Sequence, residues 1–271
     1  MSSLLRALFA LVLVAAGAVA HADSAASVFV DELTWTELRD EVRAGKTTVI
    51  VPVGGTEQSG PQIVLGKHNV RVKALAARIA ASLGNALVAP VVAYVPEGSI
   101  DPPSGHMRFP GTISIPEAAF EATLEGAARS FRQHGFRDIV LIGDHGGYQK
   151  SLQKVAARLD REWAKEASPA RVHAVEAYYL AADREFAQLL KKQGLSEAEI
   201  GSHAGAADTS LSLAVDERLV RSARLHDGSA LGVAEGVHGD PHRASLAAGR
   251  AGLDLIVART RDAIQREVAR R

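Results

Sequence analysis

Short apolar segments rich in β-branched residues alternate with longer segments of helical spacing, and this alternation limits the fold most. The predicted strands are residues 47–53, 86–94, 137–142 and 171–178, and the predicted helices are residues 70–83, 116–134 and 149–167. Strands that alternate with long helices need crossover connections, which make the sheet mostly parallel and cover both of its faces. The pattern therefore predicts an α/β fold, a three-layer α/β/α sandwich with a mostly parallel central sheet.

Two long segments interrupt the alternation. Residues 95–114 are rich in proline and glycine, and residues 225–242 form a second irregular stretch. Compact domains usually keep loops of this length for a function, so we expect both to border a pocket. Residues 244–271 are predicted to form an amphipathic helix whose arginines lie on a solvated face.

The first 22 residues have the features of a signal peptide. Arg6 precedes an apolar run, and the run ends in an Ala-His-Ala sequence of the kind that signal peptidase recognises. We expect cleavage after Ala22, export to the periplasm or the medium, and a single mature domain of residues 23–271. An uncleaved membrane anchor is less favoured, because the apolar run is shorter than the roughly 20 residues of a spanning helix.

The composition excludes several classes of function. The 31 basic and 31 acidic residues give no net charge, and no charge asymmetry indicates a nucleic-acid partner or an anionic membrane surface. The chain has no cysteine, so disulfide bonds and thiolate zinc sites are excluded. Any metal ion must therefore be bound by His, Asp or Glu side chains, which draws attention to the ten histidines.

Polar side chains follow two of the predicted strands. Glu57 comes after the Gly54-Gly55 turn that ends the first strand, and His145 follows the strand at 137–142. His68 lies eleven residues beyond Glu57. The carboxyl ends of parallel strands share one edge of the sheet, where ligands usually bind. Because a carboxylate and two neutral imidazoles are typical ligands of zinc, manganese or iron, this pattern predicts a metal site at that edge.

Simpler structural roles remain open for these residues. A histidine in a glycine loop is often only hydrogen bonded to its neighbours, and a carboxylate after a strand often caps a helix. Asp208 precedes an apolar helical run, L-S-L-A-V, and is either such a cap or a further metal ligand. His203 lies five residues earlier and, like Asp208, is a candidate for proton transfer.

Six short motifs follow one another along nearly the whole mature chain: S-V-F-V-D-E-L-T-W-T-E-L, P-V-G-G-T-E-Q-S-G-P, F-P-G-T-I-S, G-D-H-G-G, H-A-G-A-A-D-T-S and G-V-H-G-D-P. This ordered set resembles the creatininase (creatinine amidohydrolase) family. The resemblance implies a metal-dependent hydrolase of carbon–nitrogen bonds in small amides, with an α/β/α fold and usually two divalent metal ions. It also implies a homo-oligomer, commonly a hexamer.

Two of the family's metal ligands have counterparts of the same residue type in this chain, and two others are replaced. Glu57 and His145 stand at ligand positions of the family motifs E-Q-H-G and G-H-G-G. Ser59 stands in place of a histidine, and His68 stands in place of the aspartate that bridges both ions. A hydroxyl is a poor ligand of these metals, and a neutral imidazole nitrogen has one lone pair and cannot bridge two ions. The second metal position has therefore lost ligands.

Two more differences concern the same position. Gly147 supplies no ligand where creatininase has a glutamate, and Asp208 is one methylene shorter than the glutamate of the family's E-T-S. We therefore predict one divalent metal ion per chain, with zinc first and manganese or iron as alternatives, held by Glu57, His68 and His145. Asp208 is then a fourth ligand or the hydrogen-bond partner of the ion's water.

The predicted function is hydrolysis of a carbon–nitrogen bond in a small amide or cyclic amide by a metal-activated water, with His203 or Asp208 moving the proton to the leaving nitrogen. Tyr179 matches an aromatic residue that lines the family's substrate pocket. The tryptophan expected shortly before His203 is absent, so creatinine itself is not favoured. The alternatives are an exported protein that binds a metal or ligand without turnover, and a lactonase or peptidase acting on a small cyclic substrate.

Overall fold

The computed structural model describes residues 27–226 and 231–270. The predicted signal peptide and its cleavage site lie outside these residues, so export stays a prediction. Among the described residues, no helix is both long enough and apolar enough to cross a membrane.

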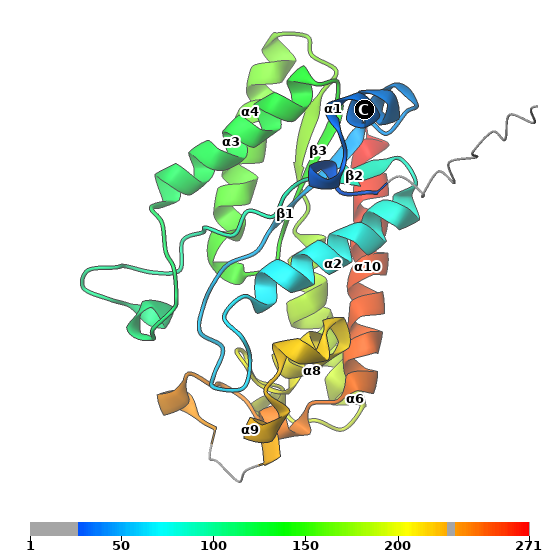
Figure 1. The fold of residues 1–271 in the computed structure, drawn as a ribbon. Coiled ribbons are helices and arrows are strands. Elements are labelled where there is room, and N and C mark those ends of the chain that lie inside the picture. Colours follow the sequence, from blue (N-terminus) through cyan, green and yellow to red (C-terminus); the bar gives the residue numbers. More distant parts are fainter. Residues whose placement is uncertain (1–26, 227–230, 271) are drawn as a thin grey trace, which may run out of the picture.

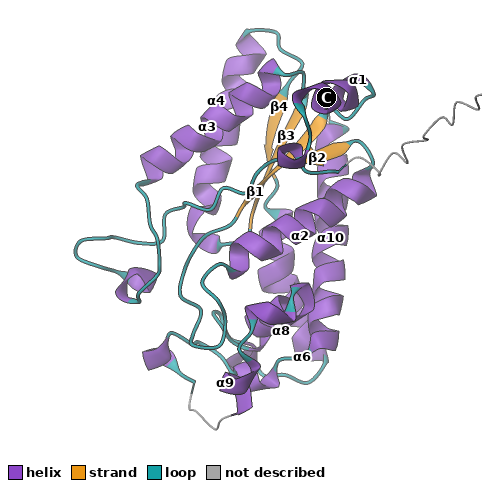
Figure 2. Ribbon diagram, viewed as in Figure 1, coloured by secondary structure: helices purple, strands orange, loops and turns teal. Residues whose placement is uncertain are grey.

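Four parallel strands form the central sheet in the order β2-β1-β3-β4 (Figure 2). Their bounds are Thr48–Val53 for β1, Ala86–Val88 for β2, Asp138–Gly143 for β3 and Arg171–Ala174 for β4. The two central strands are buried along their whole length, as expected for parallel strands covered on both faces. Val53 at the end of β1 pairs with Gly143 at the end of β3, so the loops that follow them start side by side.

Two of the strands are shorter than predicted. The segment predicted as a strand at 86–94 leaves the sheet after Val88, and only Val92 returns to form an isolated bridge with Val53. Pro90 lies in this interval, and proline has no N–H group for a strand ladder. The last predicted strand, 171–178, ends at Ala174 because the chain turns there into a helix.

Helices cover both faces of the sheet (Figure 1). On one face lie α3 (Glu117–Gln133) and α4 (Gln149–Lys165), and on the other lie α2 (Lys67–Leu83) and α10 (Leu246–Val268). Successive residues of β1 point to opposite faces, so Val49 and Val51 join the core under α3 and α4, whereas Ile50 joins the core under α2 and α10. The predicted three-layer α/β/α sandwich is confirmed.

Shorter helices complete the described chain. They are α1 (Trp35–Arg43), α5 (Ala177–Leu180), α6 (Phe186–Lys192), α7 (Glu197–Ile200), α8 (Ala206–Val215), α9 (Ser222–His226) and a π-helical segment η4 (Ala181–Glu185). The 3-10 helices are η1 (Val30–Glu32), η2 (Gly105–Arg108), η3 (Gly146–Tyr148), η5 (Glu217–Leu219), η6 (Val233–Glu235) and η7 (Pro241–Arg243). The loop predicted at 95–114 contains only η2.

A glycine allows α10 to approach α8 closely. A Cβ atom added at Gly249 would lie 1.9 Å from the backbone oxygen of Ser210. Gly249→Ala is therefore expected to lower the free energy of unfolding by about 1–3 kcal/mol, as other overpacked substitutions do, although alanine favours helices. Gly126 of α3 has no atom within 4 Å of such a Cβ, so Gly126→Ala should instead raise stability by up to about 1 kcal/mol. Urea denaturation of both variants tests this, and equal effects would contradict it.

Candidate metal centre

Glu57 enters the protein interior directly after β1. The chain turns at Gly54 and Gly55, and the N–H of Gly55 donates to Oδ1 of Asn69 at 2.9 Å. The N–H of Glu57 then donates to the backbone oxygen of Leu65 at 3.1 Å. These contacts fix the backbone on both sides of a side chain that is fully buried.

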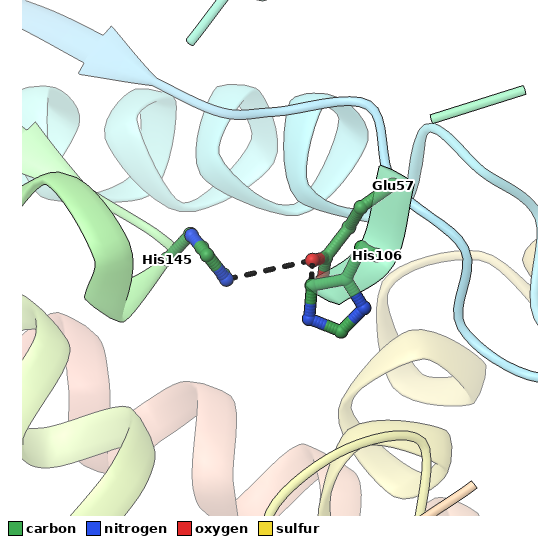
Figure 3. A group of neighbouring side chains, drawn as sticks. All are labelled: Glu57, His106 and His145. Carbon is green, nitrogen blue, oxygen red and sulfur yellow. Dashed lines mark ion pairs between the residues drawn. The ribbon is translucent and has the colours of Figure 1, made fainter. Parts of the chain in front are cut away.

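The two carboxylate oxygens of Glu57 face different surroundings. Oε1 lies 2.8 Å from Nε2 of His68 and 3.6 Å from Nζ of Lys67. Oε2 lies 3.3 Å from Nε2 of His106 and 3.4 Å from Nε2 of His145 (Figure 3). Oε2 is buried and has no hydrogen-bond partner among the described residues. One oxygen is thus already bound, and the other is free to bind a ligand.

Glu57, His106 and His145 fit a divalent metal ion. Each offers one ligand atom, and these atoms lie within 4.8 Å of one another. The two distances from Oε2 agree with the roughly 3.3–3.4 Å that separates ligand atoms around tetrahedral zinc with bonds of about 2.0–2.1 Å. Burial lowers the pKa of His145 to about 4 and also lowers the pKa of His106, so both imidazoles are neutral near pH 7 and each has one lone pair. The amide nitrogen of Gln58 lies 2.8 Å from Nδ1 of His106 and donates to it, so binding an ion through Nε2 would require the ring proton to move to Nδ1 and this hydrogen bond to break.

The sequence interpretation found two of these three residues. His145 comes from the end of β3 as expected, whereas His106 comes from η2 in the loop at 95–114. That loop was expected to border a pocket, and it contains a single histidine three residues before the F-P-G-T-I-S motif. The position of His106 was therefore visible in the sequence, although nothing in the sequence placed its ring beside Glu57.

His68 lies on the other side of Glu57. Its Nε2 atom contacts Oε1 of Glu57, and its Nδ1 atom lies 2.6 Å from Oδ2 of Asp144. Burial and the ammonium group of Lys67 lower the pKa of His68, but hydrogen bonds to the two carboxylates outweigh them and raise it overall. A protonated imidazole held between two carboxylates has no lone pair for a metal ion. The structure therefore places His68 outside the group formed by Glu57, His106 and His145.

Asp208 belongs to a buried network of ion pairs. Its Oδ2 atom lies 2.8 Å from Nζ of Lys67, and its Oδ1 atom lies 3.1 Å from Nη1 of Arg71. Nε of Arg71 also donates to Oδ2 of Asp144 at 2.8 Å. Burial alone would raise the pKa of Asp208, but Lys67 and Arg71 hold it well below its usual range. Asp208 also accepts the N–H of Ala204 at 2.9 Å, but it lies in the first turn of α8, whose N-cap is Gly205, so it is not the helix cap considered from the sequence.

His203 and Tyr179 line the same cavity as the candidate metal ligands. The cavity has a volume of about 780 Å³ and is also bordered by Phe109 and Arg108. Nε2 of His203 lies 2.9 Å from the backbone oxygen of Gln58, and its ring centroid lies 4.4 Å from that of His106. Burial lowers the pKa of His203 to about 4. The structure thus brings His203 to the candidate metal centre and sets Tyr179 in the wall of the cavity around it.

Glu97 is a further buried carboxyl group that sequence reasoning missed. Its Oε2 atom lies 3.5 Å from Nδ1 of His145, on the side of the ring away from Glu57. Neither of its oxygens has a hydrogen-bond partner among the described residues. Burial, together with the nearby Glu57 carboxylate, raises the pKa of Glu97 to about 9.

A model of the creatininase family, described as creatinine amidohydrolase, matches residues 31–264. The chain belongs to the creatininase family. The resemblance seen in the ordered motifs is thereby confirmed. The match covers the whole sheet and every residue of the candidate metal centre.

Curated relatives of this creatininase-family chain carry different names. A creatinine amidohydrolase of Pseudomonas putida is 36% identical over 126 residues, which cover 46% of this chain and 47% of the relative. A mycofactocin precursor peptide peptidase of Mycolicibacterium smegmatis is 38% identical over 119 residues, which cover 42% of this chain and 45% of the relative. The chain therefore spans about half the length of the curated relatives that it matches.

Solved creatininase structures share the fold over nearly their full length. A creatininase variant with a tryptophan replaced by alanine has a TM-score of 0.75 and 28% identity, and the match covers 90% of this chain and 99% of that one. Two further creatininase structures that match are described as a manganese form and as a zinc–zinc form of a variant. The predicted amidohydrolase fold is confirmed.

Proposed function

We propose that this chain is a metal-dependent hydrolase of a carbon–nitrogen bond in a small amide or cyclic amide, with one divalent ion held by Glu57, His106 and His145. The observation that supports it best is Oε2 of Glu57, a buried oxygen without a partner that faces two neutral imidazoles at the cavity. Such an ion would supply Lewis acidity and would lower the pKa of a bound water to roughly 7. Nitrogen and oxygen ligands suit zinc first, and manganese or iron as alternatives.

The buried network prepares Glu57 for this role. The hydrogen bond from His68 to Oε1 fixes the carboxylate so that Oε2 points toward the two imidazoles. Burial alone would raise the pKa of Glu57, but His68 and Lys67 hold it below its usual range, so the carboxylate stays ionised. In this arrangement Asp208 acts on Glu57 through Lys67. Its ion pair with Nζ of Lys67 holds that atom 3.6 Å from Oε1 of Glu57.

His203 is the residue best placed to move a proton. Its Nε2–H donates to the backbone oxygen of Gln58, which leaves the lone pair on Nδ1. Nδ1 lies 3.7 Å from Oε1 of Glu57, beside the cavity. In the proposed reaction Nδ1 accepts a proton from the attacking water and passes it to the leaving nitrogen.

A His203→Gln variant tests this proton transfer. The amide of glutamine keeps a donor for the Gln58 oxygen but has no basic nitrogen, so kcat should fall by about 10²- to 10⁴-fold. Metal content per chain should not change, because His203 is not one of the proposed ligands. The exposed His242→Gln variant serves as a control. Loss of metal together with activity in His203→Gln would assign His203 to metal binding instead.

The cavity and the relatives support a proposal for the substrate class. A volume of about 780 Å³ is in the upper part of the range for small-molecule sites, roughly 300–1,000 Å³. Phe109 and Tyr179 supply aromatic walls. This size favours a substrate larger than a single small ring, and a short peptide is the second candidate because a relative is named as a peptide peptidase.

A metal-reconstituted chain tested against linear amides, lactams, lactones and short peptides decides between these substrates. Release of an amine from an amide or lactam, abolished by a chelator and restored by zinc or manganese, would support the proposal. Cleavage of lactones alone would favour the lactonase alternative. A chain that binds the ion and a ligand but turns over none of these compounds would favour the non-enzymatic binding protein.

Two broader expectations join this proposal. We propose that residues 1–22 direct export, so that the mature chain acts in the periplasm or outside the cell, and that it assembles as a homo-oligomer, with the hexamer as the form implied by the family. Cell fractionation with N-terminal sequencing tests the first, and light scattering of the purified chain tests the second.

A further inference from the structure

Glu97 is buried, with the carboxylate of Glu57 and the ring of His145 among its titratable neighbours. Its side chain is fully inaccessible to solvent, and neither carboxyl oxygen has a hydrogen bond among the described residues. A buried polar group left unsatisfied costs about 1–3 kcal/mol, and more when it is charged. Such a group in a native structure calls for an explanation. One explanation is a bound ion at a functional site, or a hydrogen bond that forms only when the ion is bound.

The surroundings of Glu97 hold its carboxyl group in place. The backbone N–H of Glu97 donates to Oγ of Ser114 at 2.9 Å, and the same hydroxyl donates to the backbone oxygen of Gly98 at 2.8 Å. A Cβ atom added at Gly55 would lie only 2.6 Å from Oε1 of Glu97. The absence of a side chain at Gly55 therefore makes the space that the carboxyl group occupies.

His145 lies between Glu97 and Glu57. Its Nε2 atom faces Oε2 of Glu57 at 3.4 Å, and its Nδ1 atom faces Oε2 of Glu97 at 3.5 Å. A histidine that binds a metal through one ring nitrogen usually donates the N–H of the other to a carboxylate or carbonyl, which fixes the ring and raises its basicity. Glu97 is the carboxyl group within reach of that second nitrogen.

A competing contact concerns the same nitrogen. The backbone N–H of Gly147 lies 3.2 Å from Nδ1 of His145 and can only donate. It can therefore bond to Nδ1 only when that atom carries no proton. Metal binding through Nε2 puts the remaining proton of the neutral ring on Nδ1, and the acceptor available to that proton is then Glu97 rather than Gly147.

We propose that Glu97 is a positioning residue of the metal centre, which accepts Nδ1–H of His145 and holds Nε2 toward the ion. The inference rests on the metal site proposed above. It gives the loop at 95–114 two functions in one centre, because η2 supplies the ligand His106 and the start of the loop supplies the support for His145.

Metal affinity of the purified chain tests the inference. The metal-free protein is titrated with Zn²⁺ in competition with a chromophoric chelator, for the wild type and for Glu97→Leu and Glu97→Gln. Leucine cannot accept an N–H, so Glu97→Leu should weaken Zn²⁺ binding by about 10- to 100-fold, with a smaller loss for Glu97→Gln, whose amide oxygen still accepts. Glu121→Gln, a buried carboxyl change in α3 beside Lys154, is the matched control and should bind as the wild type does.

Two spectroscopic readouts separate positioning from other roles. In the Zn²⁺ form of the wild type, ¹⁵N NMR should show a protonated Nδ1 on His145, and Glu97→Gln should keep this tautomer while shifting its resonance. The Co²⁺ absorption spectrum should have the same coordination number in wild type and Glu97→Gln. A lower coordination number in the variant would overturn the inference, because Glu97 would then be a ligand itself.

The outcomes for the inference and for the function are distinct. A wild type that binds Zn²⁺ together with a Glu97→Leu variant that binds it equally tightly would overturn the role of Glu97 alone. A wild type that binds no ion would overturn the metal-dependent function and the inference with it. Circular dichroism of each variant checks that the fold is kept, and Glu97→Gln, which preserves side-chain size, carries the test if Glu97→Leu does not fold.

Discussion

His106→Ala and His145→Ala are each expected to weaken binding of the divalent ion by more than about 100-fold and to abolish hydrolysis. Each substitution removes one of three ligand atoms, which should cost more than the 10- to 100-fold typical of outer partners. The remaining pair, Glu57 with one imidazole, is a poor site for zinc or manganese. Elemental analysis after gel filtration measures the ion per chain, and chelator competition measures the affinity.

His106→Ala is the decisive variant of this pair. If the ion is held by Glu57, His68 and His145, as expected from the sequence, His106→Ala should keep it. If it is held by Glu57, His106 and His145, the variant should lose it. His134→Ala, at an exposed position after α3, is the control for removing a histidine. Two ions per wild-type chain would contradict the single site in either form.

Arg71→Met is expected to give the largest loss of stability. Arg71 is almost fully buried and contacts two carboxylates, Asp144 and Asp208, through Nε and Nη1. Removing it leaves both carboxylates without their shared partner at a site where the Asp144 side chain is fully buried and the Asp208 side chain is 18% exposed. Breaking a buried ion pair in this way costs about 3–5 kcal/mol. For a chain of this size that corresponds to a fall in Tm of roughly 6–20 °C, which differential scanning calorimetry measures.

An exposed arginine provides the matched control. Arg129 forms ion pairs with Glu125 and Glu162 at 2.6 and 2.5 Å, but its side chain is 39% exposed. Arg129→Met should therefore change the free energy of unfolding by less than about 1 kcal/mol. Similar losses in both variants would show that the buried network is not special.

The pH dependence of the same variant has a definite sign. In the wild type, Arg71 and its neighbours hold the pKa of Asp144 and Asp208 below the usual value of 3.8. The ionised carboxylates therefore stabilise the folded state fully above pH 3.8, and this contribution is lost as the pH falls through their lowered pKa values in the folded protein. Without Arg71 the two carboxyl groups should take up protons at a higher pH. The stability difference between wild type and Arg71→Met should therefore shrink on acidification, and a constant difference would contradict the account.

The layers of the fold could be predicted because they depend on local periodicity. The buried runs at β1 and β3 and the helical spacing of α2, α3 and α4 appear directly in the sequence, and parallel pairing follows from their alternation. The edge shared by Glu57 and His145 could be predicted for the same reason, since both residues follow central strands.

The centre itself could be predicted only in part, because long-range contacts decide it. The loop at 95–114 has no periodic pattern, and its path is set by bonds such as Ile113 N–H to the backbone oxygen of Thr56 at 2.9 Å and Gln58 N–H to Oγ1 of Thr112 at 3.1 Å. These bonds bring His106 to Glu57. The sequence interpretation did place His68 near Glu57, but it did not show that His68 also contacts Asp144, far along the chain, and Arg71, one helical turn away.

The pairing of Val53 with Gly143 places the loops that carry Glu57 and His145 at one edge of the sheet, whereas His106 comes from a separate loop. His145 follows β3, and Glu57 follows β1 in a loop held by Asn69 and Leu65, so the sheet and these loop contacts together set their spacing. His106 arrives on a segment that the sheet does not require. A bound ion would therefore link the edge of the sheet to the loop at 95–114. The substrate range can change through this loop while the sheet and its folding stay the same.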